Sequence, residues 1–132
     1  MVTMAWRGAF GNDEVNRLHA NAFQHGPIRD DWTAKLERYS LGWVTARADD
    51  GALVGFVNVA WDGGVHAFIL DTMVDPTRGR AGIGTDLVRM AAENASNSGC
   101  EWLHVDFEPH LRSFYLDACG FTPTAAGLIR LR

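Results

Sequence analysis

Glycine and arginine residues gather in the segment DPTRGRAGIG, residues 75–84. The glycines, which are Gly79, Gly82 and Gly84, are expected to let the backbone take a positive φ and to bring amide groups close to a ligand. The segment opens an apolar helical pattern, and the first N–H groups of a helix lack internal partners while the helix dipole adds positive potential. Arg78 and Arg80 add donors for phosphate oxygens. These residues predict a site for an anion such as a pyrophosphate.

Two other phosphate-binding loops match less well. A P-loop requires Gly-Lys followed by Ser or Thr, and Gly82 is followed here by Ile83, Gly84 and Thr85 without a lysine. A dinucleotide loop would have a third glycine where Leu87 stands, although Asp106 could serve as its acidic residue. A tight strand-to-helix turn without any ligand is the remaining alternative.

The loop is expected to join a buried strand to a long helix. Residues 67–74 are continuously apolar in character, which predicts a strand buried on both faces. An apolar stripe then follows at helical spacing: Ile83, Leu87, Val88, Ala91 and Ala95. Residues 101–107 alternate like a strand. A strand, helix and strand in this order cross over right-handedly, so the two strands should run parallel.

The flanking segments complete a mixed α/β pattern. We expect a short strand at residues 3–6, a helix capped by Asn12 or Asp13, and a second helix after Asp30. A hairpin of strands should span residues 43–61 with its turn at 49–51. After the loop unit come a short helix at 111–118 and one or two short strands in 121–132. No linker or repeat interrupts residues 1–132, so one domain is predicted.

Composition excludes several classes of protein. The chain has 132 residues, a formal charge of −4, 47% hydrophobic and 21% charged residues. It lacks the basic face of a duplex nucleic-acid binder, an apolar run that would cross a membrane and a secretory signal, so we expect a cytoplasmic protein. Cys100 and Cys119 lack the spacing of a zinc or redox pair, and no metal site is expected.

Two segments resemble a known family. LDTMVDPTRGRAGIGTDLV, residues 70–88, resembles the acyl-CoA-binding motif of the GNAT superfamily of N-acetyltransferases. SFYLDACGF, residues 113–121, resembles the family's later motif, in which Phe-Tyr on a short helix precedes Gly-Phe. The likeness covers at least residues 43–123. Two positions depart from it: Gly79 stands where the family usually has Arg or Gln, and Glu108 where Asn is common.

The resemblance implies a fold and a cosubstrate. The fold would be α/β (α+β), with a mixed central sheet of six to seven strands, about four helices and splayed central parallel strands. The cosubstrate would be acetyl-CoA, with no metal. The residues expected to hold it are Met73, Val74, Arg78, Gly79, Arg80, Ala81, Gly82, Ile83, Gly84 and Thr85.

The implied chemistry is direct attack of an amine on the thioester, which needs a proton acceptor and a proton donor. Tyr115 matches the tyrosine that gives a proton to the coenzyme sulfur. A backbone N–H near Met73 or Val74 would stabilise the oxyanion. Asp71 is taken as a catalytic residue and is one candidate for the base, and the role remains open to His66, His104, Asp106, Glu108 or a chain of water molecules.

The acceptor would be a small-molecule amine, a protein N-terminus or a lysine, with no nucleic acid or membrane as partner. The loop at residues 25–32 is expected to contact it. A terminal strand would be able to pair across a homodimer. Two alternatives stay open: a non-catalytic acyl-CoA-binding GNAT-like module for sensing or interaction, and a regulator that uses the same loop for another nucleotide.

Overall fold

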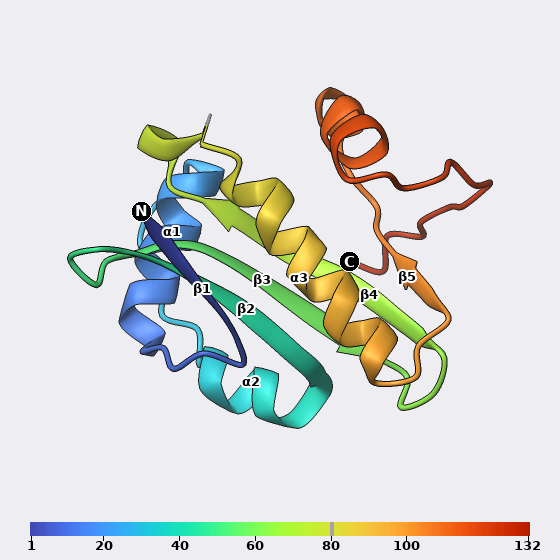
Figure 1. Ribbon diagram of the computed structural model, residues 1–132, viewed down its shortest axis with the longest axis horizontal. Coiled ribbons are helices and arrows are strands. Elements are labelled where there is room, and N and C mark those ends of the chain that lie inside the picture. The colour runs from blue at the N-terminus through green and yellow to red at the C-terminus, as the bar shows by residue number, and fades with distance from the viewer. Residues whose placement is uncertain (80) are drawn as a thin grey trace.

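The computed structural model describes residues 1–79 and 81–132 as a mixed sheet with helices on both faces (Figure 1). In this part of the chain the sheet has five strands in the order β1-β2-β3-β4-β5; β1 to β4 pair antiparallel and β5 runs parallel to β4. The strands are β1 (Val2–Trp6), β2 (Ser40–Ala48), β3 (Leu53–Trp61), β4 (His66–Val74) and β5 (Trp102–His104). The helices are α1 (Asn12–Phe23), α2 (Trp32–Tyr39), α3 (Ile83–Asn97), the 3₁₀ turns η1 (Pro76–Arg78) and η2 (Pro109–Leu111), and the π-helical η3 (Ser113–Ala118). The expected α/β class and the parallel strand–helix–strand unit are confirmed.

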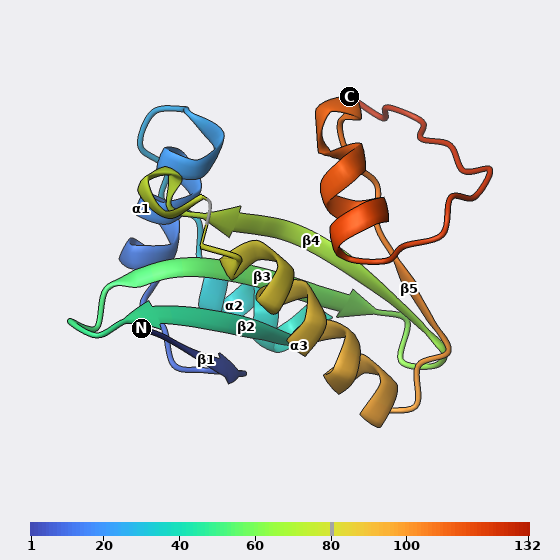
Figure 2. The ribbon, with the colours of Figure 1, turned by 45° about the horizontal axis from the view of Figure 1, so that its top comes forward.

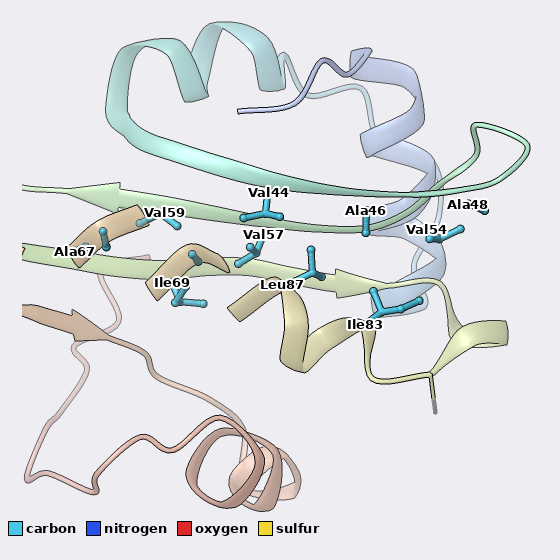
Figure 3. Packing of buried hydrophobic residues seen from close by; sticks show 12 residues of the cluster. Val44, Ala46, Ala48, Val54, Val57, Val59, Ala67, Ile69, Ile83 and Leu87 are labelled. Carbon is cyan, nitrogen blue, oxygen red and sulfur yellow. The ribbon is translucent and has the colours of Figure 1, made fainter. Parts of the chain in front are cut away.

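Two apolar layers hold the helices on the sheet. The predicted stripe of α3 is buried against β2, β3 and β4, where Leu87 faces Val44, Val57 and Ile69 (Figure 3). On the other face α1 and α2 cover a second cluster built around Trp32, Leu36, Phe56 and Met73. Apolar burial of this kind is the dominant favourable term in folding. None of the described helices is long and apolar enough to cross a membrane.

The expectation that β4 is buried on both faces was wrong. Ala67 and Ile69 are buried beneath α3, but the side chains that alternate with them, Phe68 and Leu70, are 39% and 43% exposed. The reason is helix placement: α2 packs on β2 and β3, and α1 reaches β4 near Met73. The continuous apolar run predicted two buried faces for this strand, but only the face toward α3 is fully covered.

The region after α3 has less regular structure than expected. The strand predicted at 101–107 is limited to Trp102–His104, and the described residues 121–132 contain no strand, so the sheet has five strands rather than six to seven. This terminal segment loops away from the rest of the molecule (Figure 2). Pro123 lacks a backbone donor, and Leu128, Ile129 and Leu131 remain exposed, so the segment has little to stabilise a strand.

The start of α1 also differs from its prediction. Gly11 is the N-cap rather than Asn12 or Asp13, and its N–H donates to the Glu14 carboxylate at 2.9 Å. The Asn12 side chain instead accepts a hydrogen bond from Thr33 N at 2.9 Å. Asn12 thus connects α1 to the start of α2, a tertiary role that propensity does not reveal.

Candidate active site

A β-bulge in β4 lies at the centre of the site. Asn58 of β3 stands opposite Leu70 and Phe56 opposite Met73, so Asp71 and Thr72 together oppose one residue of β3. Asp71 adopts a φ of 56°, which is uncommon for a residue other than glycine. A bulge of this kind re-aims side chains and bends the strand.

Two neighbouring side chains at the bulge point to opposite faces of the sheet. The Asp71 carboxylate lies on the α1 side, where its Oδ1 is 3.9 Å from Nε2 of His19. The Thr72 hydroxyl lies on the other side, close to the phenol of Tyr115. The two functional groups therefore approach one point of β4 from two directions.

β4 and β5 separate next to this point. Their parallel ladder covers three pairs, from His66 with Trp102 to Phe68 with His104, and β5 ends there. The part of β4 from Ile69 to Val74 consequently has no parallel partner among the described residues. Unpaired strand edges present N–H and C=O groups that another extended chain can bind. The expected splay of the central parallel strands is thus present.

The predicted anion loop leads into α3. Asp75 accepts hydrogen bonds from Thr77 N and Oγ1 at 3.0 and 2.8 Å, which shapes the turn after β4. Ala81 N donates within the loop to Arg78 O at 3.2 Å, so this N–H is already engaged. The Arg78 side chain is exposed, and the predicted contact from Arg80 lies outside the described residues.

A second set of backbone donors lies at the first turn of α3. Gly82 caps the helix without a side chain, and Asp86 N donates to Gly82 O at 3.1 Å. The N–H groups before Asp86, on Ile83, Gly84 and Thr85, therefore open toward the helix N-terminus. The Ile83 side chain is buried in the core, so only the backbone of this residue can face a ligand at the N-terminus of α3.

The three loop glycines serve different purposes. Only Gly82 has the expected positive φ, 76°, whereas Gly79 has a φ of −62° that any residue adopts. Gly84 permits close packing, because a Cβ there would lie 3.1 Å from the Phe114 ring. The positive φ predicted for Gly79 and Gly84 was wrong, since one left-handed residue is enough to turn the chain into α3.

Contact between Gly84 and Phe114 brings the two sequence motifs together. Tyr115, the next residue, is only 6% exposed and stacks on Phe107 at 5.0 Å between ring centroids. Burial raises the pKa of the Tyr115 phenol, because it penalises the charged form. Thr72 Oγ1 is buried without a hydrogen-bond partner of ordinary geometry among the described residues, so its proximity to the phenol falls short of a hydrogen bond.

A cleft of about 1250 Å³ opens between α3, the separating strands and the C-terminal segment. Thr85 and Arg89 line it from α3, and Asp106 and Leu116 from the opposite side. This volume is sufficient for a large ligand. Within residues 1–79 and 81–132 no group of three or more His, Cys, Asp or Glu side chains is arranged to hold a metal ion.

The other candidate bases lie elsewhere. His66 Nδ1 and His104 Nε2 are 2.8 Å apart at the paired end of β4 and β5, and Phe68 stacks on His104. Asp106 and Glu108 are exposed beyond the end of β5. Of the carboxylates and imidazoles considered from sequence, Asp71 is the one that the bulge places beside α1.

Sequence reasoning missed His19. Its ring makes tilted contacts with Phe23, at 4.6 Å between ring centroids, and with Trp32, at 5.6 Å, and its Nδ1 lies 2.6 Å from His25 Nε2. Burial lowers the pKa of His19, while the Asp71 carboxylate opposes that shift. His25 lies in the loop expected to contact the acceptor, but no spacing in the sequence connects His19 with Asp71.

Comparison with known proteins agrees with this architecture. The profile of the acetyltransferase (GNAT) family matches residues 9–121. A search of curated proteins found no match. A protein of unknown function from meticillin-resistant Staphylococcus aureus has 21% identity and a TM-score of 0.82, covering 100% of this chain and 99% of its own. Glucosamine-6-phosphate N-acetyltransferase from Arabidopsis thaliana has 14% identity and a TM-score of 0.75, covering 97% of each chain.

A third structure, AAC(6′)-Iy in complex with the bisubstrate analogue CoA-S-monomethyl-acetylneamine, has 17% identity and a TM-score of 0.72, covering 100% of this chain and 98% of its own. At these identities the structural matches establish the fold, and the profile match over most of the sequence establishes the family. This chain belongs to the GNAT family of acetyltransferases.

Proposed function

We propose that the protein transfers an acetyl group from acetyl-CoA to a primary amine by direct attack within a ternary complex. The observation that supports this best is the bulge in β4, which directs Asp71 toward α1 and Thr72 toward Tyr115 beside the N-terminus of α3. A carboxylate and a phenol on opposite sides of one strand suit a reaction in which the two substrates meet across a narrow opening.

The loop and α3 would hold the pyrophosphate of acetyl-CoA. The N–H groups of Ile83, Gly84 and Thr85 supply preorganised donors at a helix N-terminus. The exposed Arg78 supplies charge, whereas Ala81 shapes the loop through its internal hydrogen bond. Gly79 and Gly82 contribute backbone geometry, and the contact from Arg80 remains a prediction.

The pantetheine arm would extend along the unpaired part of β4. Its amides resemble a peptide strand and can pair with the main chain there. The orphaned Thr72 hydroxyl fits this arrangement, because a buried polar group without a partner is costly unless a ligand satisfies it. Backbone N–H of Met73 or Val74 would stabilise the oxyanion.

Tyr115 would protonate the thiolate as the C–S bond breaks. Burial favours its neutral phenol, the form that can donate a proton. On the opposite face the negative charge of Asp71 would attract the acceptor ammonium. Small amines, protein N-termini and lysines all carry such a group.

Release of coenzyme A with a panel of amines tests the proposal. Spermidine, lysine, kanamycin and a peptide with a free N-terminus would each be added to acetyl-CoA and protein, with thiol release followed spectrophotometrically. At least one amine should accelerate release well above hydrolysis. Calorimetric titration with acetyl-CoA, ATP and NAD provides the binding control, and acetyl-CoA should bind most tightly.

The outcomes separate the competing functions. Tight acetyl-CoA binding without release by any amine, including further primary amines and lysine-containing proteins, would favour a non-catalytic acyl-CoA-binding module. Tighter binding of ATP or NAD would favour a nucleotide-binding regulator and contradict the proposal.

A further inference from the structure

Three polar side chains from separate segments meet on the α1 side of the bulge. His19 comes from α1, His25 from the loop after it, and Asp71 from β4. Their polar atoms form a chain: His25 Nδ1 lies 2.7 Å from Gly26 O, His25 Nε2 lies 2.6 Å from His19 Nδ1, and His19 Nε2 lies 3.9 Å from Asp71 Oδ1. The side chains of His19 and Asp71 are 22% and 28% exposed, so a ligand can reach them.

This chain determines which nitrogens carry hydrogen. A carbonyl oxygen only accepts, so Nδ1 of His25 must be the donor to Gly26 O. Neutral His25 then has a lone pair on Nε2, and Nδ1 of His19 must donate to it. Neutral His19 is left with its own lone pair on Nε2, the nitrogen that faces Asp71.

The space between His19 Nε2 and Asp71 Oδ1 thus has an acceptor on each side. At 3.9 Å the two atoms are too far apart for a hydrogen bond, and neither has a hydrogen to share in the neutral-imidazole state. A primary ammonium has three N–H donors and can donate to both atoms at once. The geometry suits a cationic amine better than a neutral or anionic ligand.

We propose that His19 is the base that deprotonates the acceptor ammonium, with Asp71 as the counter-ion and His25 as the positioning residue that sets the tautomer of His19. The inference rests on the proposed acetyl transfer and deepens it. Asp71 holds the ammonium and then stabilises the imidazolium, while His19 Nε2 receives the proton.

The protons balance. The ammonium loses one proton to His19 Nε2, and the freed nitrogen lone pair forms the C–N bond as the C–S bond breaks. Tyr115 gives a proton to the departing thiolate and is restored by the second proton of the attacking nitrogen. The products are the amide, the thiol of coenzyme A and one proton, which leaves His19 for solvent.

The charged groups around His19 agree with this role. Asp71 from β4, His25 and Asp30 from the loop and Lys35 from α2 all act on the imidazole. Burial has the largest effect and lowers the pKa of His19, so the ring is neutral at neutral pH and available as a base. Activity should therefore rise with pH through the His19 pKa, which lies below its ordinary value of about 6.5.

The kinetic test compares the pH profiles of wild type and His19→Gln, using the panel amine that gives the fastest release. Glutamine keeps a polar side chain but is not a base. We expect kcat/KM to fall about 100-fold at neutral pH, the lower end of what general-base catalysis supplies, and the acid limb below about 6.5 to disappear. His110→Gln is the control, because it removes an exposed imidazole of η2 that neither lines the cleft nor was a candidate base, and it should keep the wild-type profile.

Nitrogen NMR of histidine-labelled protein provides a readout that does not need turnover. In wild type we expect His19 to carry hydrogen on Nδ1 and a lone pair on Nε2, and His25→Ala should give a mixture of tautomers. Asp71→Asn should lower the pKa of His19 further, because it removes the charge that raises it.

These results distinguish failure of the inference from failure of acetyl transfer. An active wild type whose acid limb survives in His19→Gln, or a His19 that carries hydrogen on Nε2, would overturn the role of His19 and leave acetyl transfer standing. If no amine releases thiol but acetyl-CoA binds, acetyl transfer fails and the role of His19 as a catalytic base is overturned with it.

Discussion

The two sides of β4 at the bulge differ in both chemistry and access. On the α1 side Asp71 and His19 are charged or basic and partly exposed. On the η3 side Thr72 and Tyr115 carry neutral hydroxyls and are largely enclosed. The bulge shifts the alternation of side chains along β4, so that Asp71 lies on the α1 side of the strand and Thr72 on the η3 side.

Of the changes at the two sides of β4, Tyr115→Phe is expected to reduce activity most. The change removes the only hydroxyl of that side chain and keeps the ring that stacks on Phe107. We predict that kcat falls about 100-fold or more, as expected for loss of a general acid, with little change in acetyl-CoA binding. Steady-state kinetics and calorimetry measure the two quantities. Full activity in this variant would remove Tyr115 from the mechanism.

Asp71→Asn should have a smaller effect, about 10- to 100-fold on kcat/KM, because the base remains while its counter-ion is lost. Asparagine tolerates a positive φ, so the bulge should persist and the change isolates the charge. Kinetics with the best panel amine would show whether the loss appears mainly in KM for the amine. An unchanged kcat/KM together with an unchanged pKa of His19 would contradict the proposed charge pair.

Thr72→Val should have the smallest effect. Removal of a buried, unpaired hydroxyl is expected to leave the free protein equally stable or more stable by about 1 kcal/mol. If that hydroxyl contacts acetyl-CoA, affinity for the thioester should fall by a few-fold. Thermal unfolding with and without acetyl-CoA tests both statements. A large loss of stability in the free protein would reveal an internal partner for Thr72.

Sequence analysis predicted best the features that depend on a local residue pattern. The apolar stripe of α3 could be located because helical spacing leaves a mark on residue type, whereas only Gly82 of the three glycines expected to have a positive φ has one. Tyr115 was identified by its motif, and the structure brings it against the start of α3 through Phe114 and Gly84. The engagement of Ala81 N–H inside the loop could not be anticipated, since several glycine loops share one composition.

The C-terminal segment and β4 were less predictable. Alternation in residues 101–107 suggested a full strand, yet a strand needs a partner along its length, and pairing with β4 stops at His104. The apolar run of β4 suggested two covered faces, but coverage depends on where α1 and α2 pack. The pairing of residues 101–107 and the coverage of β4 both depend on other parts of the chain, so neither can be seen in the sequence of the segment itself.

The sequence alone indicated the family, the glycine loop and the helix behind it, and it singled out Tyr115 as a candidate, because each depends on residues close together in the chain. Only the tertiary structure decided that Asp71 faces α1, that Thr72 faces Tyr115 and that His19 and His25 join Asp71. His19 and Asp71 are brought together by packing of α1 on β4, and their directions follow from a bulge whose register depends on β3. Residues so far apart in sequence leave no local pattern that would reveal their contact, so only the folded structure shows it.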